Sequence, residues 1–316
     1  MSDGTHLLIP YASSTADGCV QALKPLALPH LEKLLARMTA AGRDDGDEST
    51  LSMPHERALA RAIGLTDQDG LIPWAAWEAH QAGRDIGAGA WARITPCHWR
   101  VGTGQVAMDP PSTLHLDEGQ SRALLDAMQP YFREDRIALE FHQPMFWLAQ
   151  GEIFRDLPTA SLERVAGRSV DDWMPRMREA APLRRLQQEM QMLLYTHPVN
   201  EERERTGLLP VNSFWVNGAG VLVGEPAAPA GLSIALSLRD AAVQGDWQAW
   251  AAVWQQVDAT ECARLLADLD AGKPATLTLC GERSAQTFTG AGGGGLLRRL
   301  RAMAAGRKAT MQLEAL

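Results

Sequence analysis

Between residues 197 and 212 the chain gathers side chains suited to holding a ligand. Arg203 supplies a planar guanidinium with several N–H donors, and Asn200 and Asn212 each supply an acceptor and a donor. His197 adds an imidazole at the start of the segment. A guanidinium flanked by amide groups suits a small anionic ligand, which it binds through charge-assisted hydrogen bonds. The chemistry indicated here is anion binding.

The same side chains also suit a purely structural role. We expect Asn200, Arg203 and Asn212 to converge in one hydrogen-bonded cluster, with Arg203 paired to a carboxylate such as Glu201 or Glu204. A buried network of this kind is satisfied without any ligand, so the structural role is the one we expect to dominate. As a binding site, the cluster would instead leave Arg203 facing a cleft.

The surrounding sequence predicts the elements that position these groups. An amphipathic helix precedes them and ends before Pro198, because the residue ahead of a proline is pushed out of the helical region. Residues 200–205 are expected to form a polar loop, followed by a buried strand at 213–217 and a glycine-rich turn at 218–220. This order is typical of ligand sites at the strand ends of α/β folds. The apolar face of the helix carries Leu183, Leu186, Met190, Leu193 and Leu194.

This stretch also resembles a known family. Residues 197–220 read His-Pro-Val-Asn, two residues, Arg, three residues, Gly, and then Pro-x-Asn and Gly-Ala-Gly. This pattern resembles that of the archaeal-type, bisphosphoglycerate-independent phosphoglycerate mutases, which are metal-dependent members of the alkaline phosphatase superfamily. A weaker likeness extends over residues 6–100, and the family usually has arginine where this chain has Asn217. The residues that carry the resemblance are His197, Pro198, Val199, Asn200, Arg203, Gly207, Pro210, Asn212 and Gly218 to Gly220.

The resemblance implies where a phosphotransfer centre would lie. In the family, the first strand ends in a metal-binding Asp, but the strand expected at 6–10 is followed here by Tyr11, with Asp17 farther along. The family's phosphorylated serine lies near the start of a helix, which corresponds to residues 54–63. Ser52 is the hydroxyl within reach, so it is the candidate catalytic residue, although it lacks the family's Gly-Ser-Asp context.

Histidine distribution argues against a metal centre. A two-metal site needs several carboxylates and imidazoles around the nucleophile, and the family draws its second group of ligands from the part after the 197–220 motif. No histidine occurs in the 119 residues (316 minus 197) that follow His197. We therefore predict no metal ligands and no cofactor. If the chain is active instead, the alternative cofactor is Mn²⁺ or Zn²⁺.

The composition of the chain limits the classes of molecule that it can bind. With 46% apolar residues and 22% charged residues, the 316-residue chain is typical of a globular protein with ample core. The net charge of −8 disfavours nucleic acid and anionic membranes as partners. The four cysteines are widely spaced and form no C-x-x-C, which argues against a zinc knuckle or a disulfide framework. We expect a cytoplasmic protein that binds a small anionic ligand or a protein partner, with no nucleic acid or membrane involved.

The predicted fold class is α/β. We expect a mostly parallel sheet flanked by helices, with an alkaline-phosphatase-like core formed by residues 1–70 and 205–316. Residues 71–204 are expected to be an inserted α+β segment, so that the strand at 213–217 rejoins the sheet of the strand at 6–10.

Local patterns give further predictions. The acidic run at 43–50 is expected to be an exposed loop. Other predicted elements are helices at 27–40 and 54–63, capping boxes opening helices at Asp117 and Asp258, a buried tryptophan stripe ending at Val257, a strand at 275–280, and a basic helix at 296–303.

Two functions remain open from sequence. In the first, the chain is a phosphoglycerate-mutase-like protein that has lost the two-metal phosphotransfer centre and acts as a ligand- or partner-binding, regulatory protein. In the second, it is an active phosphoglycerate mutase or phosphomonoesterase with a rearranged site.

Overall fold

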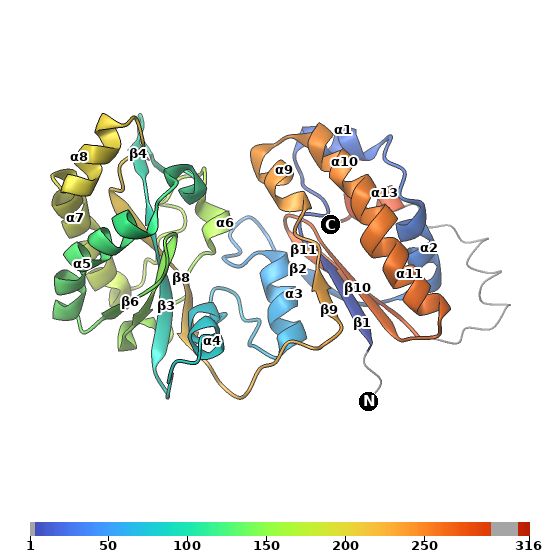
Figure 1. The fold of residues 1–316 in the computed structure, drawn as a ribbon. Helices are drawn as coiled ribbons and strands as arrows, with labels where there is room; N and C mark the ends of the chain where they lie inside the picture. Colours follow the sequence, from blue (N-terminus) through green and yellow to red (C-terminus); the bar gives the residue numbers. More distant parts are fainter. Residues whose placement is uncertain (1–3, 292–308) are drawn as a thin grey trace. The chain divides into compact units, whose positions relative to one another are not determined.

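A computed structural model describes residues 4–291 and 309–316, which form two compact units (Figure 1). The first unit is discontinuous in sequence and comprises Met1–Ser49, Met53–Gly64 and Ala227–Leu316. The second unit comprises Thr50–Ser52 and Leu65–Pro226. The helix predicted at 296–303 lies outside the described residues.

The first unit is built on a five-stranded sheet. Its central strand pairs are parallel, β1 with β10 and β1 with β9, whereas β10–β11 and β11–β2 are antiparallel. The predicted α/β class is therefore confirmed, with a mixed sheet. In spatial order the strands are β2 (Thr39–Asp45), β11 (Ser284–Gly290), β10 (Ala275–Cys280), β1 (Thr5–Ile9) and β9 (Leu232–Ile234).

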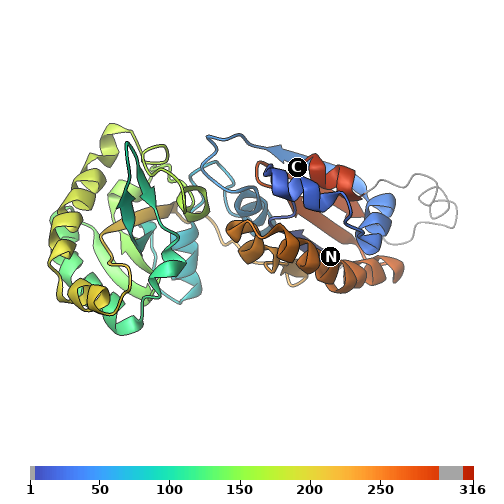
Figure 2. The same ribbon diagram turned by 90° about the horizontal axis from the view of Figure 1, so that it is seen from above.

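Helices cover both faces of this sheet (Figures 1 and 2). Side chains of a strand alternate between faces, so Leu7 and Ile9 of β1 pack into the larger core while Leu8 faces α3 (Pro54–Ile63). The bounds predicted for α3 are confirmed. The larger core is formed with α1 (Asp17–Leu23), α2 (Pro29–Arg37), α9 (Leu238–Gln244), α10 (Trp247–Val257), α11 (Ala263–Asp270) and α13 (Ala309–Glu314).

The tryptophan stripe on α10 holds the loop that follows β1. Trp250 and Trp254 are fully buried, as their helical spacing predicts. Their indole N–H groups donate to the carbonyl oxygens of Tyr11 (2.9 Å) and Ala12 (3.1 Å). The stripe therefore packs the core and fixes the main chain at the end of β1 at the same time.

The capping box predicted at Asp258 is wrong. α10 continues without a break through a π-helical turn, η4 (Asp258–Cys262), into α11, so Asp258 opens no helix. Its buried carboxylate instead accepts hydrogen bonds from the main-chain N–H groups of His30 (3.2 Å) and Leu31 (2.8 Å). These are first-turn donors of α2, which have no acceptor within their own helix. Asp258 caps a helix 228 residues away in sequence.

The second unit is built on a four-stranded antiparallel sheet, so it has the α+β character predicted for the inserted segment. In spatial order its strands are β6 (Ala138–Gln143), β7 (Phe146–Gln150), β3 (Ala90–Cys97) and β8 (Ser213–Val221). Buried residues of α5 (Glu118–Glu134) and α7 (Ala181–Tyr195) share one core with the sheet, and α4 (Trp74–Gln81) packs on β3 and β8. As predicted, Asp117 caps α5 through the N–H of Gln120.

Shorter elements complete the second unit. They are the hairpin β4 (Trp99–Val101) and β5 (Val106–Met108), the helices α6 (Leu162–Val165) and α8 (Pro198–Arg205), and the 3₁₀ turns η1 (Pro111–Leu114), η2 (Glu152–Phe154) and η3 (Arg178–Ala180). None of the helices in residues 4–291 and 309–316 is long and apolar enough to cross a membrane.

The prediction that the strand at 213–217 joins the sheet of β1 is wrong. It forms the start of β8, which pairs with β3 in the second sheet. The second unit consequently runs to Pro226 and does not end near residue 205. Gly218 and Gly220 have positive φ angles and lie against Trp74 and Pro73. The glycine-rich stretch, expected to be a turn, is the part of β8 that α4 approaches closely.

Replacing Asp258 with alanine is expected to destabilise the first unit by about 1–3 kcal/mol, because two N–H groups at the start of α2 lose their acceptor. Urea unfolding measures the loss. Asp240→Ala, which removes an exposed carboxylate from α9, is the matched control and is expected to stay within about 0.5 kcal/mol of wild type. Equal urea midpoints for the two variants would contradict the capping role.

Candidate functional site

The polar segment at 200–205 is helical, so the predicted loop is wrong. α7 ends at Tyr195 and α8 begins at Pro198, whose missing N–H is no loss in a first helical turn. The side chain of His197 caps α8, since its Nδ1 accepts the N–H of Val199 (3.2 Å). Burial lowers the pKa of His197, which favours the neutral imidazole that this cap requires.

Asn200 is buried, and both the nitrogen and the oxygen of its side-chain amide form hydrogen bonds with main-chain groups. Nδ2 donates to the carbonyl oxygens of Leu194 (2.8 Å) and Val211 (2.6 Å), and Oδ1 accepts the N–H of Val211 (2.8 Å). The side chain thus joins the end of α7 to the chain entering β8.

Arg203 is fully buried, with 0% of its surface exposed. Its Nε donates to the carbonyl of Leu209 (2.9 Å), and its terminal nitrogens donate to the side chain of Gln120 and the carbonyl of Leu114. Burial lowers the pKa of Arg203, an effect that the charge of Asp117 opposes.

The predicted pairing of Arg203 with Glu201 or Glu204 is wrong. Both carboxylates are on exposed positions of α8, while Arg203 points to the buried side of that helix. On a helix, residues one or two positions apart do not face each other. The guanidinium is satisfied by neutral carbonyl and amide oxygens instead.

Asn212 ties the same segment to the end of β3. Its Oδ1 accepts the N–H of Trp99 (2.7 Å), its Nδ2 donates to the carbonyl of Trp99 (2.8 Å), and its own N–H donates to Cys97 (3.1 Å). His98 adds a contact from its Nδ1 to the carbonyl of Pro210 (2.8 Å).

The structure therefore places three of the predicted site residues along one segment, residues 209–212, and not around one point. Asn200, Arg203 and Asn212 each bond to the main chain on or beside this segment, rather than to one another as predicted. These hydrogen bonds fix the main chain that leads into β8. The buried guanidinium presents no face to solvent.

At the end of β1 in the first unit, Tyr11 adopts a left-handed conformation with φ of 56°. Its ring lies 5.3 Å from that of His55, at an interplanar angle of 39°. The carboxylate of Glu282 accepts hydrogen bonds from the hydroxyls of Ser14 (3.1 Å) and Thr15 (2.7 Å). Asp17 is exposed in the first turn of α1. Tyr11, at the position where the resemblance implies a metal-binding Asp, is therefore packed against His55.

Ser52, the candidate nucleophile, is buried and already engaged. Its Oγ accepts the N–H of Gly70 (2.8 Å), and its own N–H donates to the carboxylate of Asp69 (2.7 Å). The same carboxylate accepts the N–H of Leu51 (3.0 Å). Ser52 and Asp69 therefore link two parts of the chain, and the hydroxyl is turned inward from solvent.

The side chains that could bind a metal ion do not gather in one place among the described residues. Within residues 4–291 and 309–316, no three His, Cys, Asp or Glu side chains are grouped so that they could hold a metal ion. The four cysteines are free and buried, and burial raises the pKa of the Cys97, Cys262 and Cys280 thiols well above the usual range. Such thiols are poor nucleophiles and poor metal ligands.

One charged cluster escaped the sequence analysis. Residues 43–45, expected to lie in an exposed loop, belong to β2, and Asp44 accepts hydrogen bonds from Arg57 (3.0 Å) and Arg61 (2.6 Å) of α3. Burial raises the pKa of Asp44, but the two arginines outweigh it and bring the pKa below its usual value. The sequence carries one sign of this cluster: Arg57 and Arg61 are four residues apart, which places both guanidinium groups on one face of a helix.

Replacing Arg203 with alanine is expected to lower the free energy of unfolding by about 2–5 kcal/mol, because several buried acceptors lose their donor. Chemical denaturation measures the change. Arg205→Ala is the matched control on the same helix, since its guanidinium is exposed and pairs with Glu202. The control is expected to unfold as wild type does, because an exposed ion pair contributes little to stability. An Arg203→Ala protein as stable as the control would refute the structural role.

The Asp44 cluster predicts a pH dependence. A carboxyl whose pKa is lower in the folded state contributes stability above its unfolded pKa of about 4 and loses it as pH falls through the folded value. Asp44→Asn is therefore expected to be about 1–3 kcal/mol less stable than wild type at pH 7 and to lose less stability below pH ~4. Urea unfolding at several pH values, with Asp240→Asn as control, tests this. Parallel curves for Asp44→Asn and wild type would rule the linkage out.

No family model matches the sequence, and no curated protein matches it. Among solved structures, a cofactor-independent phosphoglycerate mutase from Thermoplasma acidophilum DSM 1728 is similar over 98% of both chains, with 15% identity and a TM-score of 0.39. The PH0037 protein of Pyrococcus horikoshii is similar over 96% of this chain and 93% of that chain, with 14% identity and a TM-score of 0.48. Because both TM-scores are below 0.5, the description of the fold rests on the topology given above.

Proposed function

We propose that this chain is a phosphoglycerate-mutase-like protein without a two-metal phosphotransfer centre, and that it acts as a regulatory protein by binding a partner. The family relationship is supported by the residues shared over 197–220. Their contacts in this chain fit a scaffold, because Asn200, Arg203 and Asn212 stabilise the main chain around residues 209–212.

The observation that carries the proposal is the arrangement at the end of β1. A two-metal centre needs carboxylates and imidazoles directed at the ions. Here the first position holds Tyr11, whose ring packs against His55, and the carboxylate of Glu282 is taken by Ser14 and Thr15. The carboxylate of Glu282 is therefore already engaged by hydroxyl donors of the same unit.

The alternative, an active mutase or phosphomonoesterase, needs an accessible nucleophile. Ser52 is only 4% exposed, and its oxygen accepts the N–H of Gly70. A nucleophile must be reached by the substrate's phosphoryl group. The burial of Ser52 therefore favours the non-catalytic proposal.

A protein partner is favoured over a small anionic ligand. Arg203, the cation expected to face an anion, is buried against carbonyl oxygens. By contrast, Met192 and Tyr195 at the end of α7 are 78% and 85% exposed. Methionine and tyrosine are enriched in protein interfaces. The end of α7 is the surface through which we propose that the partner binds.

The deciding experiment measures bound metal and catalysis on one preparation. Elemental analysis after incubation with Mn²⁺ or Zn²⁺ is expected to find well below one equivalent of metal. Conversion of 3-phosphoglycerate, and hydrolysis of p-nitrophenyl phosphate, are expected to stay at the level of a buffer blank. About two equivalents of metal together with turnover of either substrate would overturn the proposal in favour of the active enzyme.

A further inference from the structure

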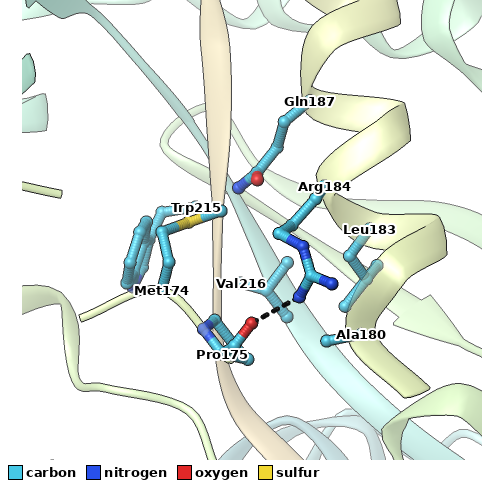
Figure 3. A pocket seen from close by; sticks show the side chains of 8 residues that line it. All are labelled: Met174, Pro175, Ala180, Leu183, Arg184, Gln187, Trp215 and Val216. Atoms are coloured by element: carbon cyan, nitrogen blue, oxygen red, sulfur yellow. Dashed lines mark hydrogen bonds between the residues drawn. The ribbon is translucent and has the colours of Figure 1, made fainter. Parts of the chain in front are cut away.

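A small pocket lies beside β8 in the second unit, between α7 and residues 174–175 (Figure 3). Nη1 of Arg184 donates to the carbonyl oxygen of Pro175 (2.7 Å), which fixes one of its walls. The space that is left takes about one water molecule, so the pocket belongs to the packing of this unit. The first unit has an open surface of another kind, at one edge of its sheet.

Strand β9 forms this edge, and among the described strands it pairs with β1 alone (Figure 1). Every second residue of β9 bonds to β1. The carbonyl of Gly231 accepts the N–H of His6 (2.8 Å), and the N–H of Ala235 donates to the carbonyl of Leu8 (2.9 Å). Such alternation is general in a parallel ladder, so the residues in between direct their main-chain groups away from β1.

Ile234 carries both an open donor and an open acceptor on the outer side of β9. Of the two residues that face outward, Leu232 already gives its N–H to the carbonyl of Pro229 (3.0 Å). Within residues 4–291 and 309–316, neither the N–H nor the carbonyl of Ile234 has a hydrogen-bond partner. In an antiparallel pair of strands, a residue of this kind exchanges two hydrogen bonds with the residue opposite.

The side chains at this edge are apolar and uncharged. Ile234 and Leu236 are 38% and 55% exposed, and Leu232 is half-buried. No charged residue occurs in residues 226–238. A strand edge that is open, apolar and uncharged is a template for pairing with another strand.

Two other sheet edges carry protection. At the outer edge of β6, the carbonyl of Leu139 accepts from the side chain of Gln129 (3.0 Å), and that of Phe141 accepts from Arg84 (3.2 Å). The other edge of the first sheet, β2, ends in three charged residues in a row. Proteins use such devices to prevent edge-to-edge pairing. As far as the chain is described, β9 has neither, which indicates that its edge is covered when the protein is assembled.

We propose that β9 is a dimerisation edge, which pairs antiparallel with β9 of a second copy of this chain about a twofold axis. At the axis, Ile234 lies opposite Ile234 of the second copy, and each N–H donates to the carbonyl of the other. Leu232 of each copy then lies opposite Leu236 of the other copy. The pairing joins two five-stranded sheets into one continuous sheet.

A second copy fits this edge better than an unrelated chain does. A twofold interface brings the same surface of both copies together, so that surface has to be complementary to itself. The donor and acceptor of Ile234 meet this condition, and residues 226–238 meet themselves without charge repulsion. Selection of a foreign partner relies largely on complementary charges, which this stretch does not contain.

This inference goes beyond the proposed function. Strand β9 belongs to the first unit, whereas the end of α7, where we propose that the partner binds, belongs to the second. A monomeric protein would leave the metal and turnover measurements unaffected.

The test is sedimentation equilibrium of the full chain at concentrations from about 1 to 300 µM. We expect the mass to rise from that of one 34.4 kDa chain toward twice that value. The expected Kd is about 10–100 µM, because an interface built on a few residues is small and weak. Over the same concentrations, hydrogen exchange of the Ile234 amide is expected to slow about tenfold, because its N–H gains an acceptor. Both measurements use the wild-type protein, so they do not depend on how a variant folds.

Two variants locate the interface. Ile234→Lys places two like charges beside the twofold axis and is expected to weaken dimerisation about tenfold or more. Val243→Lys is the matched control, because Val243 is 51% exposed on α9 of the same unit and lies outside the strand. It is expected to dimerise as wild type does.

Four results would each overturn the proposal. They are a single 34.4 kDa species at every concentration, an Ile234→Lys dimer as tight as that of wild type, equal weakening by Val243→Lys, and exchange of the Ile234 amide that does not change with concentration.

Discussion

The second unit depends on one buried cation that has no carboxylate in contact with it. The guanidinium of Arg203 exchanges its hydration for the carbonyls of Leu209 and Leu114 and the amide of Gln120. A buried charge is tolerated only when hydrogen bonds replace the lost water. In return, two of these bonds fix main-chain carbonyls, those of Leu209 and Leu114, and the third fixes the side chain of Gln120 on α5. Helix α8, helix α5 and the entry to β8 are thereby held at one buried point.

The first unit applies the same principle with neutral and anionic groups. Indoles of Trp250 and Trp254 satisfy the carbonyls that follow β1, and the carboxylate of Asp258 satisfies the N–H groups that begin α2. In each case a side chain from a distant part of the chain completes the hydrogen bonding of a strand or helix end. Buried main-chain N–H and carbonyl groups must be hydrogen-bonded, so at these ends the side chains have to fill the core and supply hydrogen bonds at the same time.

Periodicity predicted elements well and their partners poorly. The apolar spacing of α3, α10 and β10 gave their existence and nearly their bounds, because each buries one face. The polar residues of 200–205 show little apolar periodicity and so predict a loop, although Pro198 at a first helical position indicates α8. Which sheet a buried strand joins depends on tertiary pairing, so β8 was assigned to the wrong one. The amide of Asn200 and the guanidinium of Arg203 are recognisable in the sequence as hydrogen-bonding groups, but their carbonyl partners have no sequence signature.

The discontinuity of the first unit also bears on the order in which the protein forms during synthesis. Residues 65–226 are almost the whole of the second unit, so its antiparallel sheet can assemble as soon as that stretch leaves the ribosome. Strand β1 is synthesised before the second unit, but its neighbours β9 and β10 follow more than 200 residues later. The apolar side chains of Leu7 and Leu8 therefore stay exposed to solvent until β9 and β10 have been synthesised. Apolar strand surface that stays exposed is prone to aggregation until its partner strands are made.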